Sequence, residues 1–443
     1  MKRLLVAMGA GASLFAVTAQ GSGFAIIEQS VSGLGSAFAG GSASAEDAST
    51  VFFNPAGMMK LGDQATSVAA LHSIAPSAEF TDTGSGPTPP LSGGDGGDAG
   101  HGAIVPNLYY VGQNQNGMRF GLGIGAPFGM GTEYDADWKG RYYGIKSELK
   151  VVNINPAVAL KASDKLSIGV GLNLQTASAT LTSAVNVGGN GVTSPVGVCA
   201  GLAFFGFPTA GCIGAGDADA EISGSSVGWG VNYGVLYQMG ANTDIGFHYR
   251  SGVRHELDGD ADFTNTPTEL SNMGYLVDTD AEAVMNLPAT ASLSLNHGMG
   301  SVRILADATW TNWEQMSELR VSYDTGNQGD TVDALGWKNT GRYSIGMLYS
   351  VNDAMTIRAG VARDESPVPN EERRSVRVPD GDRTWLALGL GYKLGNGMAI
   401  DAGFASIAVD SVEIDKNETF KGKLVGEYDN SVNIISVSGS MSF

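Results

Sequence analysis

From Leu61 onward, hydrophobic and polar residues alternate with a period of two, as in strands with one apolar face. Turn residues interrupt this alternation, and the interruptions switch strictly between long and short. The long ones lie near residues 83–102, 131–147, 188–222, 265–283, 326–337, 364–381 and 417–429. The short ones lie at residues 114–117, 163–165, 240–242, 297–300, 351–353 and 395–397. Seven long and six short connections predict about fourteen strands.

Short turns at one end and long loops at the other are typical of outer-membrane barrels with an even strand number. Closure also removes edge strands, whose unpaired backbone groups lipid does not tolerate. In the last strand, Ile435, Val437 and Met441 alternate with serines, giving one apolar and one polar face. We therefore predict an all-β fold, a 14-stranded antiparallel transmembrane β-barrel over residues 63–443. A soluble sandwich is the alternative, although it does not require such regular loop lengths.

The N-terminus reads as a secretory signal peptide over residues 1–21. Lys2 and Arg3 precede an apolar core, Leu4–Val17, and small residues follow it. Cleavage is expected between residues 19 and 22. Together with the barrel pattern, this signal predicts a protein of the Gram-negative outer membrane.

The segment between the signal and the barrel, residues 22–62, is rich in Gly, Ala and Ser and has neither helical nor strand periodicity. It contains the turn sequence Asn54-Pro55-Ala56-Gly57, in which the proline favours an extended Asn54. On composition alone the segment is either a disordered linker or a compact unit enclosed by the rest of the chain.

Three groups of motifs resemble the FadL/TodX/OmpP1 family of outer-membrane long-chain fatty acid and hydrocarbon transporters. The first comprises GF, SGLGSAFAG and EDASTVFFNPAGM near the N-terminus. The second comprises LPATASLSL and WTNWEQMSELRV, and the third RAGVARDESPVP and VPDGDRTWLALGLGY. The resemblance implies that residues 22–62 form an N-terminal hatch inside the barrel lumen. It also implies that Phe24 lines an apolar pocket for the ligand tail.

A glycine-rich stretch, residues 120–132, should form the third strand. Glycines at 121, 123, 125, 129 and 131 occupy one face, and Pro127 falls in the same series. We expect Leu122, Phe128 and their even-numbered neighbours to face outward. Because proline cannot donate to a strand ladder, Pro127 predicts a local break. The break is either a tolerated bulge or a lateral gate flanked by Gly125 and Gly129. The family resemblance implies the gate, since its members have a kinked third strand.

Several basic residues fall on strand faces that should line the lumen. Alternation places His248, Arg250 and Arg254 on one such face, Lys338 and Arg342 on another, and Arg358 on a third. They could hold a carboxylate head group through charge-assisted hydrogen bonds. Alternatively, they pair with acids such as Asp401 and Glu46 and fix the hatch. The resemblance favours Arg250 and Lys338 as ligand contacts.

The long connection around residues 192–216 carries an apolar cluster that includes Phe204, Phe205 and Phe207. Exposed apolar patches often mark binding sites, so this loop could capture a hydrophobic ligand; alternatively, it packs as a small satellite core. Cys199 and Cys212 flank the cluster. In an exported chain, such an isolated pair is expected to form a disulfide.

Composition limits the chemistry. The formal net charge of −19 argues against a nucleic-acid partner. The G-x-S-x-G match at residues 224–228 opens a strand and lacks the strand-to-helix turn of a hydrolase. Aspartates near 258–262 lack the remaining features of a calcium loop. We therefore expect no enzyme activity, no cofactor and no metal.

The predicted function is passive uptake of long-chain fatty acids across the outer membrane. Outer loops would capture the ligand, a lumen pocket would bind it, and the kinked third strand would release it sideways. Aromatic or aliphatic hydrocarbons are the alternative ligands; an outer-membrane lipase and a general porin are more distant alternatives. Expected partners are membrane lipids, lipopolysaccharide and the barrel-assembly machinery, whose signal the terminal Phe443 resembles. We expect a monomer.

Overall fold

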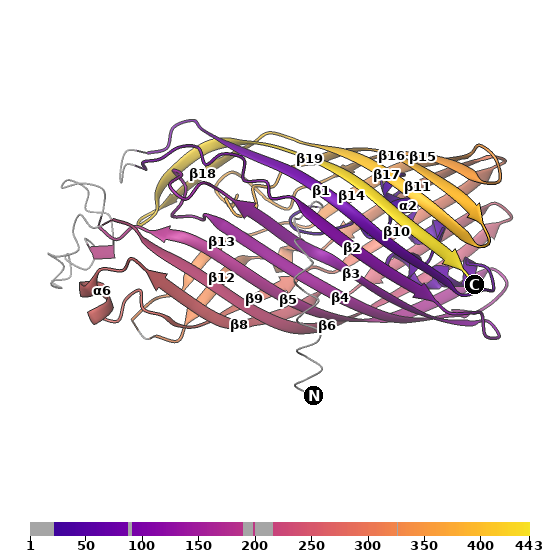
Figure 1. Ribbon diagram of the computed structural model, residues 1–443, viewed down its shortest axis with the longest axis horizontal. Helices are drawn as coiled ribbons and strands as arrows, with labels where there is room; N and C mark the ends of the chain where they lie inside the picture. Colours follow the sequence, from indigo (N-terminus) through magenta and orange to yellow (C-terminus); the bar gives the residue numbers. More distant parts are fainter. Residues whose placement is uncertain (1–21, 87–90, 189–197, 200–215, 326) are drawn as a thin grey trace.

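The computed structural model describes residues 22–86, 91–188, 198–199, 216–325 and 327–443, whose strands close into a cylinder (Figure 1). The strands are β1 (Thr66–Asp82), β2 (Ala103–Val111), β3 (Met118–Glu133), β4 (Lys146–Lys161), β5 (Leu166–Val185), β6 (Ala218–Gly240), β7 (Thr243–Arg250), β8 (Val253–Thr264), β9 (Thr279–Leu287), β10 (Thr290–Met299), β11 (Val302–Thr311), β12 (Glu318–Tyr323), β13 (Thr331–Ala334), β14 (Thr340–Ser350), β15 (Met355–Asp364), β16 (Arg383–Gly395), β17 (Met398–Val409), β18 (Val412–Glu418) and β19 (Gly422–Ser442). The helical turns are α2 (Val31–Leu34), α3 (Gly41–Ser44), α4 (Thr50–Phe53), η2 (Pro55–Lys60), α6 (Thr268–Asn272) and η3 (Trp313–Gln315).

These strand segments make fourteen passes along the cylinder, as the loop pattern predicted. Among the described residues, five passes are interrupted and consist of two segments each: β7/β8, β9/β10, β11/β12, β13/β14 and β17/β18. Antiparallel pairing of β1 with β19, from Thr66↔Ser442 to Asp82↔Gly426, closes the ring. One expected long connection is wrong, since β18 and β19 pair across residues 417–429 up to Glu418↔Gly422.

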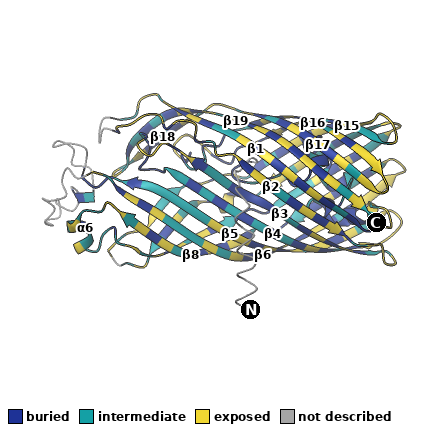
Figure 2. Cartoon of the chain, viewed as in Figure 1, coloured by how far each residue is buried: buried dark blue, intermediate teal, exposed yellow. Residues whose placement is uncertain are grey.

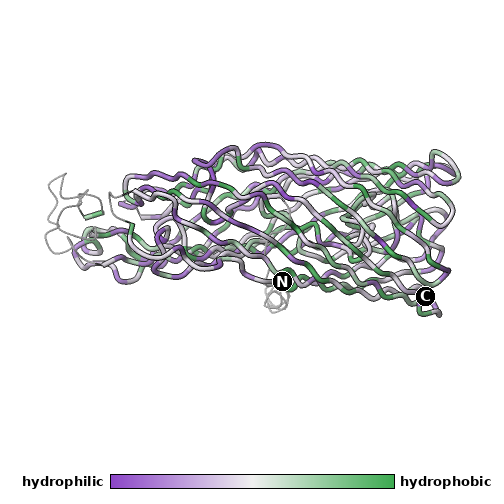
Figure 3. The backbone as a smooth tube through the Cα atoms, turned by 90° about the horizontal axis from the view of Figure 1, so that it is seen from above, coloured by the Kyte–Doolittle hydropathy of each residue, from purple (hydrophilic) through white to green (hydrophobic). Residues whose placement is uncertain are grey.

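The outer wall carries the apolar face of the alternation. In β19, Ile435 and Val437 are 63% and 51% exposed, whereas Ser436 and Ser438 are buried. Exposed residues lie on the outside of the cylinder (Figure 2), and hydrophobic residues are concentrated toward the end that carries the short turns and the C-terminus (Figure 3). No helix among the described residues is long and apolar enough to span a membrane.

Residues 22–62, here called the N-terminal segment, contact strands all around the ring. α2 packs on β16, β17 and β19, whereas α3 packs on β7, β10 and β11. η2 packs on β3, β4, β5 and β6. Because these strands surround the lumen, the segment lies across its interior, and most of its residues are buried.

Glycines in the wall make this close packing possible. A Cβ atom at Gly360 would overlap the backbone of Ser36, and one at Gly246 would overlap the Ser42 carbonyl. Any side chain at these positions would therefore displace the N-terminal segment.

Breaks within strands reverse which residues face the lumen, and three predicted orientations are wrong for this reason. The β3–β4 register shifts between Gly125 and Phe128, so Phe128 points inward although Leu122 points outward. Residues 251–252 interrupt β7/β8, and Arg254 is exposed rather than luminal. Residues 335–339 interrupt β13/β14, which leaves Lys338 exposed and Trp337 buried. One extra residue in a strand exchanges its two faces.

Substitution of Gly360 by leucine should displace the N-terminal segment and open the lumen. We expect planar bilayers containing the Gly360→Leu protein to show large, stable ionic currents that the wild type lacks. Gly439→Leu is the matched control, because a Cβ at Gly439 meets no atom within 4 Å. If a folded Gly360→Leu barrel shows the same currents as the wild type, the N-terminal segment is not what closes the lumen.

Candidate functional site

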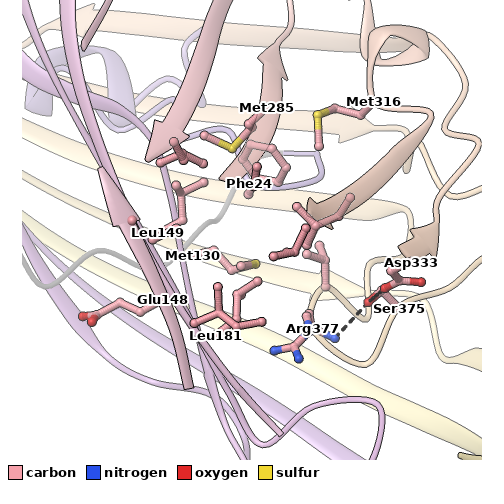
Figure 4. Close-up of a pocket in the computed structure, with 18 of the residues that line it drawn as sticks. Phe24, Met130, Glu148, Leu149, Leu181, Met285, Met316, Asp333, Ser375 and Arg377 are labelled. Atoms are coloured by element: carbon pink, nitrogen blue, oxygen red, sulfur yellow. Dashed lines mark hydrogen bonds between the residues drawn. The ribbon is translucent and has the colours of Figure 1, made fainter. Parts of the chain in front are cut away.

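An apolar cavity lies inside the barrel around Phe24 (Figure 4). Its empty space, which includes space open to solvent, amounts to about 820 Å³. Its apolar lining includes Phe24, Met130, Leu149, Ala179, Leu181, Ile222, Leu257, Met285, Met316, Leu319, Val321, Leu335 and Trp337. These residues come from many strands that are distant in sequence, so only closure of the barrel assembles the cavity.

Phe24 is the aromatic centre of this site. Its ring lies 5.0 Å from Trp313, 5.6 Å from Trp337 and 6.1 Å from Phe128, measured between centroids. Gly23 has φ of +65°, and a Cβ there would crowd both tryptophans. The Gly-Phe pair therefore lets the backbone approach the indoles while the phenyl ring enters the cavity.

Beside Phe24, the N-terminal segment pairs with β3 at the predicted break. β2 pairs with β3 only from Val111↔Gly121 to Leu108↔Ile124, so β3 beyond Gly125 has no β2 partner. Ala25 forms an antiparallel bridge with Phe128 instead. The Ile26 amide donates to the Pro127 carbonyl at 2.8 Å, and the Gly129 amide donates to the Phe24 carbonyl at 3.0 Å.

Two amide side chains extend this closure. Gln29 Nε2 donates to the Ala126 carbonyl at 2.8 Å, and Asn107 Nδ2 donates to the Glu28 carbonyl at 2.8 Å. The predicted gate residues Gly125, Pro127 and Gly129 therefore lie where residues 24–29, rather than β2, complete the wall.

The predicted turn anchors the other end of the N-terminal segment. Asn54 is extended, with φ −167° and ψ 104°, and its Oδ1 accepts from the Ala56 amide. Its Nδ2 donates to the Ser42 carbonyl at 2.7 Å and to the Val235 carbonyl of β6 at 3.0 Å. Pro55 opens η2, whose third residue, Gly57, packs against Thr50.

Three of the six predicted luminal basic residues hold the N-terminal segment instead of facing the cavity. Arg358 pairs with Glu46 and with Asp401, both at 2.8 Å, which is the alternative that the sequence left open. Arg250 bonds to Asn173 and to the Phe52 carbonyl at 3.0 Å, and stacks over the Phe52 ring.

Arg342 behaves in the same way. Its Nη2 donates to the Ala37 carbonyl at 3.0 Å, and its guanidinium lies over Trp385. Lys338 and Arg254 are exposed, as described above. None of these predicted residues lines the apolar cavity, and their role as head-group ligands stays a prediction.

Arg377 is the basic residue of the cavity that the sequence did not single out. It comes from the connection between β15 and β16 and, among the described residues, is the only basic side chain in the cavity lining. Strand alternation gives no signal in such a connection, so its inward position could not be predicted.

Toward the short-turn end, the lumen wall changes from apolar to amide side chains. In β4, Leu149 and Val151 are followed on the same face by Asn153 and Asn155, and Asn173, Gln175 and Asn232 extend this group across the neighbouring strands β5 and β6. We call these five residues the amide collar. Asn155 donates to Asn232 at 3.0 Å, and Asn153 donates to Asn173 at 3.2 Å. An apolar ligand pressed against the collar would remove water from these amides without replacing its hydrogen bonds.

The predicted capture cluster, Phe204, Phe205 and Phe207, lies outside the described residues. The same is true of Cys212, whereas Cys199 is disulfide-bonded. The described part of the chain contains no group of three or more His, Cys, Asp or Glu residues placed to hold a metal.

Comparison with known proteins identifies the family. Residues 12–443 match the family described as outer membrane protein transport protein (OMPP1/FadL/TodX). The chain belongs to this family. The long-chain fatty acid transport protein of Escherichia coli K12 is 29% identical over 426 residues, which cover 93% of each chain. Outer membrane protein P1 of Haemophilus influenzae is 28% identical over 443 residues, covering 95% of this chain and 93% of the relative.

Solved structures share the fold of this OMPP1/FadL/TodX chain. A Pseudomonas aeruginosa FadL homologue superposes with a TM-score of 0.83 at 25% identity, covering 95% of this chain and all of the other. The Pseudomonas putida toluene transporter TodX superposes with a TM-score of 0.67 at 20% identity, covering 89% of this chain and 94% of TodX. The protein is thus an outer-membrane barrel of a family that transports fatty acids and aromatic hydrocarbons.

Glu28 should make docking of the N-terminal segment sensitive to pH. Its carboxylate is fully buried and, in the part of the chain that the structure describes, has no hydrogen-bond partner in another residue. Burial raises the pKa of Glu28 from 4.5 to about 7, although its own backbone amide and nearby Arg342 and Arg383 oppose the shift and Asp364 adds to it. Protonated Glu28 therefore favours the docked state. Docking should be strongest below pH 4.5 and weaken by about 3 kcal/mol as the pH rises through 7.

Hydrogen exchange of the amides of residues 24–29, corrected for intrinsic rates, measures this effect. Protection should fall between pH 5 and pH 8 in the wild type and stay constant in Glu28→Gln. Equal pH profiles for the two proteins would contradict the role of Glu28.

Proposed function

We propose that this chain takes up long-chain fatty acids by passive diffusion and releases them sideways into the membrane. One observation carries the proposal. The apolar cavity around Phe24 adjoins the place where the wall between β2 and β3 is completed only by residues 24–29. Movement of these residues would remove one wall of the cavity and the cover of the break together.

The hatch in this proposal is the N-terminal segment. A tail that enters the cavity competes with Phe24 for contacts with Trp313 and Trp337. The hydrogen bonds between Ile26 and Pro127 and between Gly129 and Phe24 are then lost as the segment withdraws. The break at Pro127 serves as the lateral gate.

The amide collar supports a lateral exit over an axial one. Continuing toward the short-turn end would place the tail among Asn153, Asn173 and their partners, where each buried amide requires a hydrogen bond. The break lies just beyond the exposed apolar residues Phe120 and Leu122 of β3, at the height where the tail can enter lipid without crossing the collar.

Uptake of aromatic or aliphatic hydrocarbons is the second candidate. The toluene transporters that share the fold favour it, and so does the mostly apolar lining of the cavity. An enzyme has no comparable support, because the relatives are transporters and residues 224–228 lie within the uninterrupted strand β6. A general porin would need an open lumen, which the N-terminal segment fills.

The remaining parts of the proposal concern partners. We propose capture of the ligand by the loop that carries Phe204, Phe205 and Phe207, next to lipopolysaccharide at the cell surface. We also propose that the barrel-assembly machinery inserts the protein by recognising the strand that ends at Phe443. We further propose that the protein is a monomer.

A disulfide between residues 25 and 128 tests the gate. Ala25 and Phe128 form a non-hydrogen-bonded antiparallel pair, the geometry in which facing side chains come closest. Oxidised Ala25→Cys/Phe128→Cys protein should lose nearly all uptake of labelled oleate and of labelled toluene, and a reductant should restore it.

The wild type, assayed with and without reductant, is the control for the native cysteines. The single variant Phe128→Cys is the control for loss of the phenyl ring. Mass spectrometry establishes the cross-link. Unimpaired uptake by fully cross-linked protein would rule out lateral release by withdrawal of residues 24–29. Comparison of oleate with toluene in cells with and without the gene decides between the two ligand classes.

A further inference from the structure

Three neighbouring cavities follow one another from the loop end of the barrel to the break in β3. The outer cavity is bounded by Tyr142, Tyr143 and Phe263, and shares Leu181 and Leu319 with the cavity around Phe24. A third cavity touches Pro76, Gly100 and Gly131 beside the break, and shares Met130 and Val378 with the cavity around Phe24. Among the described residues, Arg377 alone lines all three.

The Arg377 guanidinium is held by neutral oxygen atoms only. Nη1 donates to the Lys146 carbonyl at 3.0 Å and to Ser147 Oγ at 2.8 Å, and Nη2 donates to the Thr182 carbonyl at 3.3 Å. No described carboxylate lies within ion-pair distance of Arg377. The carboxylate of Asp333, which lines two of the cavities, is already engaged by Lys416 at 2.8 Å and Ser375 at 2.5 Å.

Two donors of Arg377 are left for a ligand. A guanidinium has five N–H groups, and the Nε–H and one Nη2–H have no partner in the described structure. Burial lowers the pKa of Arg377, and the charge of Asp333 only partly offsets this effect. An anion that entered the cavities would relieve the cost of burying this cation.

The backbone around Arg377 is fixed, so the guanidinium has a defined position. Tyr134 Oη donates to the Val376 carbonyl at 2.7 Å, and Thr132 Oγ1 donates to the Arg377 carbonyl at 3.2 Å. Thr132 belongs to the end of β3 that follows the break, and Tyr134 directly follows β3. The cation is therefore attached to the same strand that forms the lateral gate.

We propose that Arg377 binds the carboxylate of a long-chain acid throughout its transfer, and that the tail swings about this fixed point. The tail would occupy the outer cavity first, then the cavity around Phe24, then the one beside the break. This inference rests on the proposed function and adds the residue that would select a monocarboxylate with a long apolar chain over a neutral hydrocarbon.

Binding of two ligands with the same chain tests the proposal. Purified full-length protein in detergent is titrated with oleate and with oleyl alcohol, which lacks the charge. For Arg377→Gln we expect the Kd of oleate to rise about 10- to 100-fold, since a charge-assisted hydrogen bond is lost. The Kd of oleyl alcohol should change less than about 2-fold, and Arg377→Lys should recover part of the oleate affinity.

Arg373→Gln is the matched control, because Arg373 lies in the same connection, is exposed and lines none of the three cavities. Arg373→Gln should leave the Kd of oleate and of oleyl alcohol unchanged. If Arg377→Gln raises the Kd of oleate and of oleyl alcohol equally, Arg377 has a merely structural role. An unchanged oleate affinity would overturn the proposal. If wild type binds the alcohol as tightly as oleate, the inference fails while apolar transport stands; if it binds neither, the proposed function itself fails.

Discussion

A backbone N–H or C=O group in a membrane-embedded wall needs a hydrogen-bond partner, and this requirement governs the functional part of the barrel. β3 obtains its partners from β4 on one side, with a register shift at Pro127, and from β2 on the other side only as far as Ile124. Around Pro127, the chain's own N-terminal segment supplies them, and from Thr132 onward residues 99–100 do so. A part of the wall is thus made of residues that do not belong to the barrel strands.

Contacts throughout the interior hold the N-terminal segment in place. Wall glycines such as Gly246 and Gly360 admit the backbone of the segment, and Arg250, Arg342 and Arg358 hold its carbonyl and carboxylate groups. Three of the cations expected to bind a ligand therefore contact the segment instead. This leaves the ligand cavity apolar apart from a few charged groups at its margin.

The apolar cavity and the amide collar make the two ends of the lumen chemically different. On the loop side of the collar, aromatic and aliphatic side chains line the lumen. At the collar, an apolar tail would displace water from amides that already bond to one another. The break in β3 lies at this boundary, and this position is the reason for the proposal that an apolar molecule leaves sideways.

The sequence by itself determined the strand number, the closed barrel and the membrane-facing surface, because period-two alternation and loop length are local features. It also indicated the break at Pro127, since a proline cannot complete a ladder, and the turn at Asn54. It misplaced Phe128 and Arg254, because a one-residue bulge exchanges strand faces and leaves no clear local signal. It misplaced Lys338 because residues 335–339 lie between two strands and do not follow their alternation. Only the tertiary structure decided which cations hold the N-terminal segment and that Arg377 reaches the cavity. Those contacts join residues hundreds of positions apart, and ring closure alone brings them together.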